Sequence, residues 1–377
     1  MNWNKFCVIL LLISSISCAD EKDKVSFENW YNQTEKSNPK DCEQVIHKET
    51  FESKDLKISG IAKSMSGDMS NQIVDINFWN EELIWVKGCE LDILERESGK
   101  AVSPEYLCHN IINYHKPDNL PWSILTRGTD KRIFTLSQGI NKIEFPEGFA
   151  LPMPVPAKFS IGNQVLNLND SSLKTKLKFN VGISYLKESE LCEKPKALYQ
   201  QAVYMTKKVS GAPGGYNQPD SIFEDPKVNM DTAFAQCAIS YDEGFNPYLD
   251  PYGRHFTSHW IVSTDSIEVL KTNVTPMLNL AYDTKIHYIA VHVHPYAHSL
   301  ELLDRTAGKS LFKARVTNFS SSKKGIKHVD SYSSVEGIPV FKNHEYEMIS
   351  TYTNPNGETD VSAMATMFLY LAEGDGK

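Results

Sequence analysis

The sequence lacks the features that mark nucleic-acid-binding proteins and several common enzyme classes. It has 47 acidic against 39 basic residues and a formal net charge of -8, with no basic block, so a nucleic-acid partner is not expected. It contains no GxSxG, P-loop, GxGxxG or HExxH motif, which leaves no local signature for a lipase-type hydrolase, a P-loop NTPase, a dinucleotide-binding fold or a zincin protease. No CxxC pair is present either, which argues against a thiolate zinc site or a thioredoxin-type redox motif.

Helical periodicity is also scarce, whereas aromatic residues and period-two patterns are abundant. The 377 residues include 17 Tyr, 17 Phe and 6 Trp, with 20 Gly and 18 Pro between short apolar runs. In LKFNVGISYL, apolar residues alternate from Leu177 to Tyr185, and the runs ELIWVKGCELDIL, IVDINFWN and EYEMISTYTN have similar lengths. Such runs between turn signals predict an all-β fold of sandwich or barrel type.

The length predicts two domains, each large enough to bury a core. We place the boundary near Lys187–Lys196, which gives an N-terminal β-sandwich over 42–190 and a C-terminal one over 191–377. Leu191 to Met205 fits either a helix or an irregular strand. Two segments rich in Pro or Gly, FPEGFALPMPVPAKF and VSGAPGGYNQPDS, are expected to be loops, because proline cannot lie in a central strand.

The N-terminus predicts export. Lys5 precedes a short apolar run, and small residues then lead to Cys18, which is the order of a secretory signal. The run is too short to span a bilayer. Small residues leading directly into a cysteine resemble a bacterial lipoprotein signal, in which residues 1–18 end at a lipidated Cys18 and the polar stretch 19–41 serves as a tether. A plain signal peptide, cut nearby, is the alternative.

On the lipoprotein interpretation, the protein is bacterial, lies in the cell envelope facing the periplasm or the surface, and contacts the membrane only through its lipid. Five cysteines follow Cys18, namely Cys42, Cys89, Cys108, Cys192 and Cys237. An odd number leaves at least one outside any disulfide within the chain. One or two disulfides are expected in an oxidising compartment, with a connectivity that the sequence does not fix.

Histidines concentrate in the C-terminal part, where HYIAVHVHPYAHS contains an HxH pattern. On a strand, His292 and His294 project from one face, one pleat apart, and two neutral imidazoles at that spacing can bind one metal ion. The alternative is a pair of structural histidines. His298 lies beyond Pro295 and is not expected to join the same ion, and His255 and His259 are expected to be structural.

The last segment, SAMATMFLYLAEG, contains two methionines on opposite faces of a predicted strand. Met364 shares its face with Thr366 and Phe368, whereas Met367 lies on the other face. Core packing is the simpler interpretation of either methionine. A thioether beside two imidazoles would instead select a soft ion that cycles between Cu(I) and Cu(II).

These two segments together resemble the C-terminal domain of the copper type II, ascorbate-dependent monooxygenases, the family of peptidylglycine α-hydroxylating monooxygenase and dopamine β-monooxygenase. The resemblance covers roughly Phe256 to Glu373. It implies that His292 and His294 match the family HxH and Met364 the family methionine, so that together they hold the copper at which oxygen is activated. It further implies two tandem jelly-roll β-sandwiches, and ascorbate or another reductant as the electron source. Ala365 stands where the animal enzymes have a cysteine.

The resemblance is weaker in the N-terminal domain, where the family holds a second, electron-supplying copper through three histidines. LCHNIINY resembles the strand with the family His-His pair and gives His109 followed by Asn110. VLNLND resembles the strand with the third ligand and contains no histidine; His47 and His115 would complete the site only with an unusual geometry. His109 is therefore the remnant of a second site, and one tight copper is expected.

Three functions remain open from the sequence. The first is a copper monooxygenase that hydroxylates a small-molecule or peptide substrate. The second is a non-catalytic copper-binding or copper-delivery lipoprotein, which the incomplete first site favours. The third is a structural envelope protein without metal.

Overall fold

The fold is an all-β sandwich, as the strand periodicity predicts. The computed structural model describes residues 42–64, 66–76, 83–115, 132–154, 157–209, 255–264, 266–320, 323–354 and 361–373. The predicted signal peptide with Cys18, the tether, Cys237 and most of the VSGAPGGYNQPDS segment lie outside these residues. Within them, no helix is long and apolar enough to cross a membrane.

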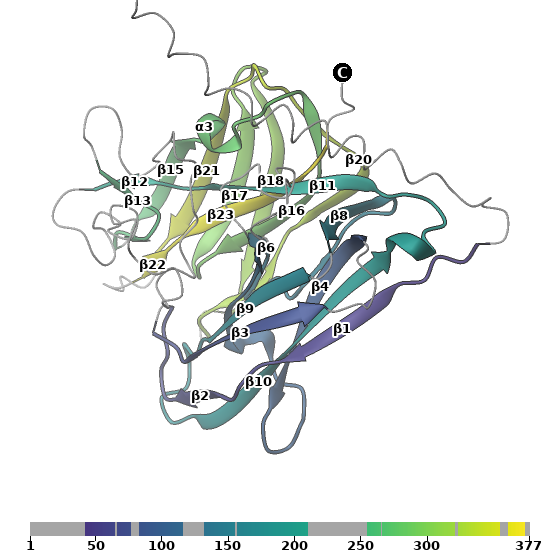
Figure 1. The fold of residues 1–377 in the computed structure, drawn as a ribbon. Coiled ribbons are helices and arrows are strands. Elements are labelled where there is room, and N and C mark those ends of the chain that lie inside the picture. Colours follow the sequence, from purple (N-terminus) through teal and green to yellow (C-terminus); the bar gives the residue numbers. More distant parts are fainter. Residues whose placement is uncertain are drawn as a thin grey trace, which may run out of the picture.

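The first half of the chain forms a jelly roll of two facing sheets (Figure 1). Its strands are β1 (His47–Glu52), β2 (Leu56–Ser59), β3 (Met69–Ile76), β4 (Leu83–Glu95), β5 (Leu107–His115), β6 (Arg132–Ser137), β7 (Lys142–Glu144), β8 (Phe149–Pro154), β9 (Ala157–Val165) and β10 (Lys174–Lys187), with 3-10 turns η2 (Pro104–Tyr106) and η3 (Glu188–Glu190). One sheet has β2 and β1 beside β10, then β4 and β8; the other has the order β3-β9-β5-β6. The strands from β2 to β5 alternate between the two sheets, and so do β8, β9 and β10, as in a jelly roll.

The second half repeats this topology. Its elements are β11 (Lys196–Tyr204), β12 (Lys207–Lys208), β13 (Phe256–Thr257), β14 (Trp260–Ile261), β15 (Ile267–Asn273), α3 (Thr275–Leu278), β16 (Thr284–Val293), β17 (Ala297–Asp304), β18 (Lys309–Asn318), β19 (Ile326–Val329), β20 (Tyr332–Val340), β21 (Tyr346–Thr353), β22 (Ser362–Ala363) and β23 (Ala365–Ala372). The sheet order is β11-β23-β16-β20 on one side and β15-β21-β17-β18-β19 on the other. The segment from Leu191 to Met205, left open by the sequence, contains β11 and no helix.

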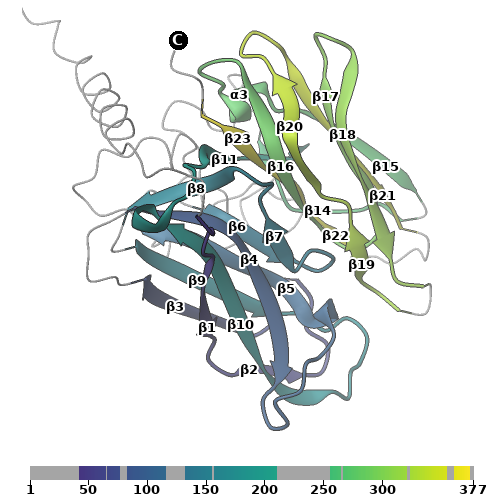
Figure 2. The ribbon, with the colours of Figure 1, turned by 90° about the vertical axis from the view of Figure 1, so that its right-hand side faces the viewer.

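The two jelly rolls join edge to edge. β8 pairs in parallel with β11, so that one sheet of each half merges into a ten-stranded sheet. Figure 2 shows the purple-to-teal strands of the first half below the green-to-yellow strands of the second. Aromatic rings from both halves pack at the junction, where the ring centroids of Phe145 and Tyr370 lie 4.7 Å apart. The Tyr370 hydroxyl donates a hydrogen bond to the Ile133 carbonyl at 2.7 Å. The boundary at residues 190 and 191 stays a prediction, since one sheet and one core run through both halves.

The expectation that the proline-rich segment FPEGFALPMPVPAKF is a loop is wrong. It contains β8 and the start of β9, and β8 pairs with β4, with Pro152 opposite Trp85. Pairing with β11 extends only over Phe149 and Ala150. The backbone nitrogens of alternate residues point to the same edge of a strand. Those of Pro152 and Pro154, which have no hydrogen to donate, therefore face the side of β8 on which β11 is no longer paired. The sequence rule holds for central ladder positions, and these two positions do not need a donor.

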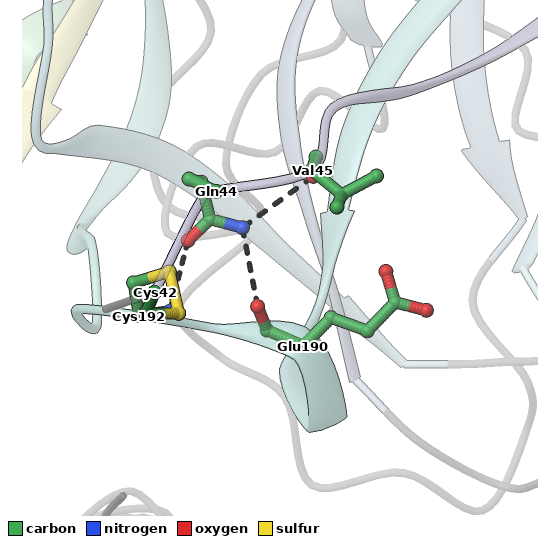
Figure 3. Close-up of a disulfide and its surroundings, with 5 residues drawn as sticks. All are labelled: Cys42, Gln44, Val45, Glu190 and Cys192. Atoms are coloured by element: carbon green, nitrogen blue, oxygen red, sulfur yellow. Dashed lines mark hydrogen bonds between the residues drawn. A yellow bond between two sulfur atoms is a disulfide. The ribbon is translucent and has the colours of Figure 1, made fainter. Parts of the chain in front are cut away.

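A disulfide fastens the start of the folded body to the connection between the jelly rolls. Cys42 is bonded to Cys192, which lies shortly before β11. Figure 3 shows Gln44 beside it, with Oε1 accepting a hydrogen bond from the Cys192 N–H at 3.0 Å and Nε2 donating to the Glu190 carbonyl. Cys89 is a buried thiol outside any disulfide, as the odd number of cysteines requires.

Candidate metal centre

Strand pairing brings the three residues of the predicted copper site together. β16 pairs antiparallel with β23, with His292 opposite Thr366 and Val293 opposite Ala365. The next pair in this register is His294 and Met364, whose backbones are joined by a hydrogen bond from the His294 N–H to the Met364 carbonyl at 3.2 Å. Because directly opposed residues share a sheet face, His292, His294 and Met364 lie on the same face. Met367 is opposite Val291, on the other face.

The backbone at Met364 is held from the opposite sheet by Tyr352, which lies on β21. Met364 is the residue between β22 and β23, where the chain changes its pairing partner from β14 to β16 and β11. The Tyr352 hydroxyl donates to the Met364 carbonyl at 2.7 Å and accepts from the His294 N–H at 3.2 Å. One buried phenol thus bonds to the backbones of both residues. Burial raises the pKa of Tyr352, so the hydroxyl keeps the proton that it donates.

All three side chains are buried. His292, His294 and Met364 are 8%, 5% and 5% exposed, and the two imidazole centroids lie 5.5 Å apart with the rings nearly perpendicular. Burial, followed by the charges of His109, Arg132 and His259, lowers the pKa of His292 to about 3. Burial and the neighbouring histidines also hold the pKa of His294 well below its ordinary value. Both rings are therefore neutral at pH 7, which is the form that binds metal ions.

The hydrogen bonds of the two rings suit metal binding. His294 Nδ1 lies 3.3 Å from the Ser362 carbonyl and 3.4 Å from the Ser362 hydroxyl; in the tautomer that donates to the carbonyl, Nε2 has the lone pair that a metal ion would need. This backbone support is typical of metal-ligating histidines. Nε2 lies 3.4 Å from the Ser64 hydroxyl of the first half. His292 Nδ1 is buried and has no hydrogen-bond partner among the described residues, and such an atom requires an explanation, an unseen ion being one.

His109, in the first half, is near enough to histidines of the second half for their charges to affect its pKa. It is buried on β5, and burial, then the charges of Arg132, His294 and His259, lower its pKa to about 3. His109 is therefore near enough to these histidines for their charges to affect one another, although the described residues include no group of three or more His, Cys, Asp or Glu side chains that could hold a metal ion. Sequence reasoning did not predict this proximity. No local pattern connects β5 or the chain before β14 to the HxH strand.

In the first half, asparagines in LCHNIINY and VLNLND stand at positions that resemble the family's other copper ligands, and their side chains make structural hydrogen bonds. Asn110 Nδ2 donates to Asn163 Oδ1 at 2.8 Å, between β5 and β9. Asn167 Nδ2 donates to the carbonyls of Gly60 and Asp170 at 2.8 and 2.7 Å. These amides hold strand ends and loops in place.

Two other histidines lie apart from the cluster. His298 is exposed, with Nε2 2.7 Å from Thr353 Oγ1, and His47 pairs with Glu190 at 2.6 Å and stacks on Tyr185. The side chain of His115 is outside the description. In the part of the chain that the structure describes, no group of three or more His, Cys, Asp or Glu side chains is arranged to hold a metal ion. A metal at this place therefore needs the Met364 thioether beside the two imidazoles.

A cavity of about 320 Å³ lies against the histidine pair, between the two jelly rolls. His292 and His294 form part of its wall, and the first half contributes Ser64 and Cys108. Cys108 Sγ lies 3.8 Å from Ser64 Oγ. The candidate metal centre thus faces a space large enough for a small organic molecule.

Comparisons with known proteins add no functional assignment. No protein-family model matches the chain, and no curated protein matches it. Similar solved structures include the STIV MCP, with 7% identity, 87% of this chain and 97% of that chain covered, and a TM-score of 0.32. PNGF-II has 9% identity, 86% and 66% coverage, and a TM-score of 0.30. A structure of the infectious bursal disease virus Gt strain has 9% identity, 90% and 75% coverage, and a TM-score of 0.17. Scores this low bear on neither the details of the fold nor the function.

Proposed function

We propose that the protein binds one copper ion through His292, His294 and Met364. The observation that carries this proposal is the register of β16 and β23, which sets Met364 opposite His294 on the face that His292 shares. Among the residues that the structure describes, the buried His292 Nδ1 has no hydrogen-bond partner, and the His294 ring lies against the Ser362 carbonyl; both features fit a metal ligand set. Two imidazoles with one thioether favour copper over harder ions.

The ligand set is tested with single variants. His292→Ala or His294→Ala should abolish tight copper binding by the purified protein. Met364→Ile should weaken Cu(I) more than Cu(II), because the thioether sulfur is a soft ligand. Met367→Ile is the matched control, since its side chain lies on the opposite face and should affect packing only. Equal weakening of Cu(I) by both methionine variants would contradict the proposed set.

We infer that the number of tight sites is one. His109 is the one histidine at the family positions of the first half, and the amides of Asn110 and Asn167 are hydrogen-bonded within the fold. A titration of the full chain should therefore saturate at one equivalent of copper, and His109→Ala should leave that number unchanged. A second tight equivalent that disappears in His109→Ala would refute this and restore a two-copper arrangement.

The cavity favours oxygen-dependent chemistry as a second candidate function, because the histidines form its wall and a substrate there would lie beside them. Bound copper would supply one-electron redox chemistry, as in the monooxygenases that the sequence resembles. The chain's own contribution would be to hold the substrate, to keep the imidazoles neutral and to exclude water. Copper-dependent oxygen consumption driven by ascorbate would support this function; binding without turnover would leave a copper-binding or copper-delivery protein.

We also propose that the protein lies in the cell envelope and is anchored to the membrane by a lipid on Cys18. Two observations support it: the lipoprotein-like sequence that ends at Cys18, and the Cys42–Cys192 disulfide, since disulfides persist in oxidising compartments.

A further inference from the structure

Ser64 brings an oxygen atom of the first half to the candidate metal centre of the second. Its Oγ lies 3.4 Å from His294 Nε2, and both residues line the cavity between the jelly rolls. In the tautomer whose Nδ1 donates to the Ser362 carbonyl, Nε2 has the lone pair and accepts the hydrogen bond from the Ser64 hydroxyl. Ser64 therefore lies in the direction in which this nitrogen would bind a metal ion.

The segment that carries Ser64 is anchored to the first half on both sides. Before it, Ala62 exchanges two backbone hydrogen bonds with Asn167, both 2.8 Å. After it, the Gly67 carbonyl accepts a hydrogen bond from the buried side chain of Gln164 at 3.1 Å. These contacts hold the hydroxyl beside His294 without help from a metal ion, and a group that is already in place costs less to order on binding.

The spacing of the two atoms brings the hydroxyl into contact with an ion on His294 Nε2. A zinc ion lies about 2.0–2.1 Å from an imidazole nitrogen, and metal–oxygen bonds are of similar length. Ser64 Oγ, 3.4 Å from Nε2, is closer than these two bonds laid end to end. An ion on this nitrogen must therefore contact the oxygen or displace it. Contact needs only that the hydroxyl rotates its hydrogen away and presents a lone pair.

We propose that the Ser64 hydroxyl oxygen is a fourth copper ligand, which binds Cu(II) and not Cu(I). This inference rests on the proposed copper function and adds to it a ligand from the other half of the molecule. A thioether is a soft donor that suits Cu(I), whereas a hydroxyl oxygen is a harder donor that suits the more highly charged ion. Met364 and Ser64 thus act in opposite directions on the balance between the two oxidation states.

The test compares the affinities of the full chain for Cu(I) and Cu(II). Ser64→Ala should weaken Cu(II) binding by about tenfold or more, the size of effect found when a supporting group of a metal site is removed, and should leave Cu(I) binding unchanged. A tenfold loss for Cu(II) alone raises the reduction potential of the bound copper by about 59 mV, because one electron is exchanged. Voltammetry should give the same shift as the two titrations. Ser64 is half-buried in a turn, and the metal-free variant should keep the wild-type thermal unfolding midpoint.

Ser362→Ala is the matched control. Ser362 Oγ also lies 3.4 Å from the His294 ring, but from Nδ1, and the variant keeps the carbonyl that contacts this nitrogen. It should change both affinities by the same factor, so the potential should stay at the wild-type value. Equal factors for Ser64→Ala, or a shifted potential in Ser362→Ala alone, would overturn the fourth ligand and leave the three-ligand site standing. A wild type that binds neither ion would overturn the copper function itself.

Cys108→Ala separates the hydroxyl from the neighbouring thiol. Cys108 Sγ lies 3.8 Å from Ser64 Oγ, and a thiolate would be a strong ligand for copper in either oxidation state. The variant should keep the wild-type ratio of the Cu(I) and Cu(II) affinities. Loss of both ions in Cys108→Ala would assign the fourth position to the thiol and would refute the role of Ser64.

Discussion

Acidification should destabilise the metal-free protein through its buried neutral histidines. The pKa values of His109 and His292 are lowered to about 3 in the folded state, mainly by burial, whereas an unfolded histidine has a pKa of about 6.5. Well above pH 6.5 these histidines are neutral in both the folded and the unfolded state, and stability is independent of them. Between pH 6.5 and 3 only the unfolded state takes up the protons, so the free energy of unfolding falls as the pH is lowered.

The size of the effect follows from the two pKa values. A single histidine shifted from about 6.5 to about 3 costs the folded state little at pH 7 and ~2 kcal/mol at pH 5, by proton linkage. The loss between these pH values is therefore ~2 kcal/mol per histidine, and ~4 kcal/mol for His109 and His292 together. That is a large part of the free energy of unfolding of an ordinary protein, which is about 5–15 kcal/mol.

Urea unfolding at pH 7 and pH 5, in the presence of a chelator, measures this loss. His292→Leu removes one titrating group, so its free energy of unfolding should fall by ~2 kcal/mol less than that of the wild type over the same interval. The carboxylates contribute equally to the pH dependence of the wild type and the variant, so their contribution cancels in the comparison. Thr366→Val is the matched control, since Thr366 lies opposite His292 and its replacement disturbs the same packing without changing a titrating group. Equal pH dependence of the wild type and His292→Leu would refute the assignment of His292 as a neutral buried ring.

Three further outcomes are expected. Tyr352→Phe should lower the free energy of unfolding by about 1–3 kcal/mol, the cost of a lost buried hydrogen bond. It should also weaken the binding of Cu(I) more than that of Cu(II), because the backbone of Met364 loses a hydrogen bond. Unchanged affinities for both ions would show that Tyr352 has no role in copper binding. Replacing both Cys42 and Cys192 with Ala opens a link that spans 150 residues and should cost up to about 5 kcal/mol in urea unfolding; an unchanged midpoint would contradict this. Cys18→Ala should give an unacylated protein that leaves the membrane fraction, and unchanged fractionation with unchanged mass would rule out the lipid anchor.

The sequence by itself determined the fold class and which of the site residues share a strand face. Alternation in the segments that became β10, β16 and β23 identifies strands, because successive side chains on a strand point to opposite faces. The same parity places His292 and His294 on one face and separates Met364 from Met367. These properties are local and depend only on a repeat of two residues.

Only the tertiary structure decided which strands are neighbours and in what register. The pairing of β16 with β23, which sets Met364 opposite His294, joins segments far apart in the chain, and pairing across such separations has no local signature. The same holds for the hydrogen bond of Tyr352 from the opposite sheet, for Cys192 as the partner of Cys42, and for the proximity by which the charge of His294 affects the pKa of His109. Likewise, β8 can contain Pro152 and Pro154 only because its pairing with β11 ends at Ala150. Local sequence sets the direction in which a side chain points, whereas its neighbours follow from the packing of the two jelly rolls.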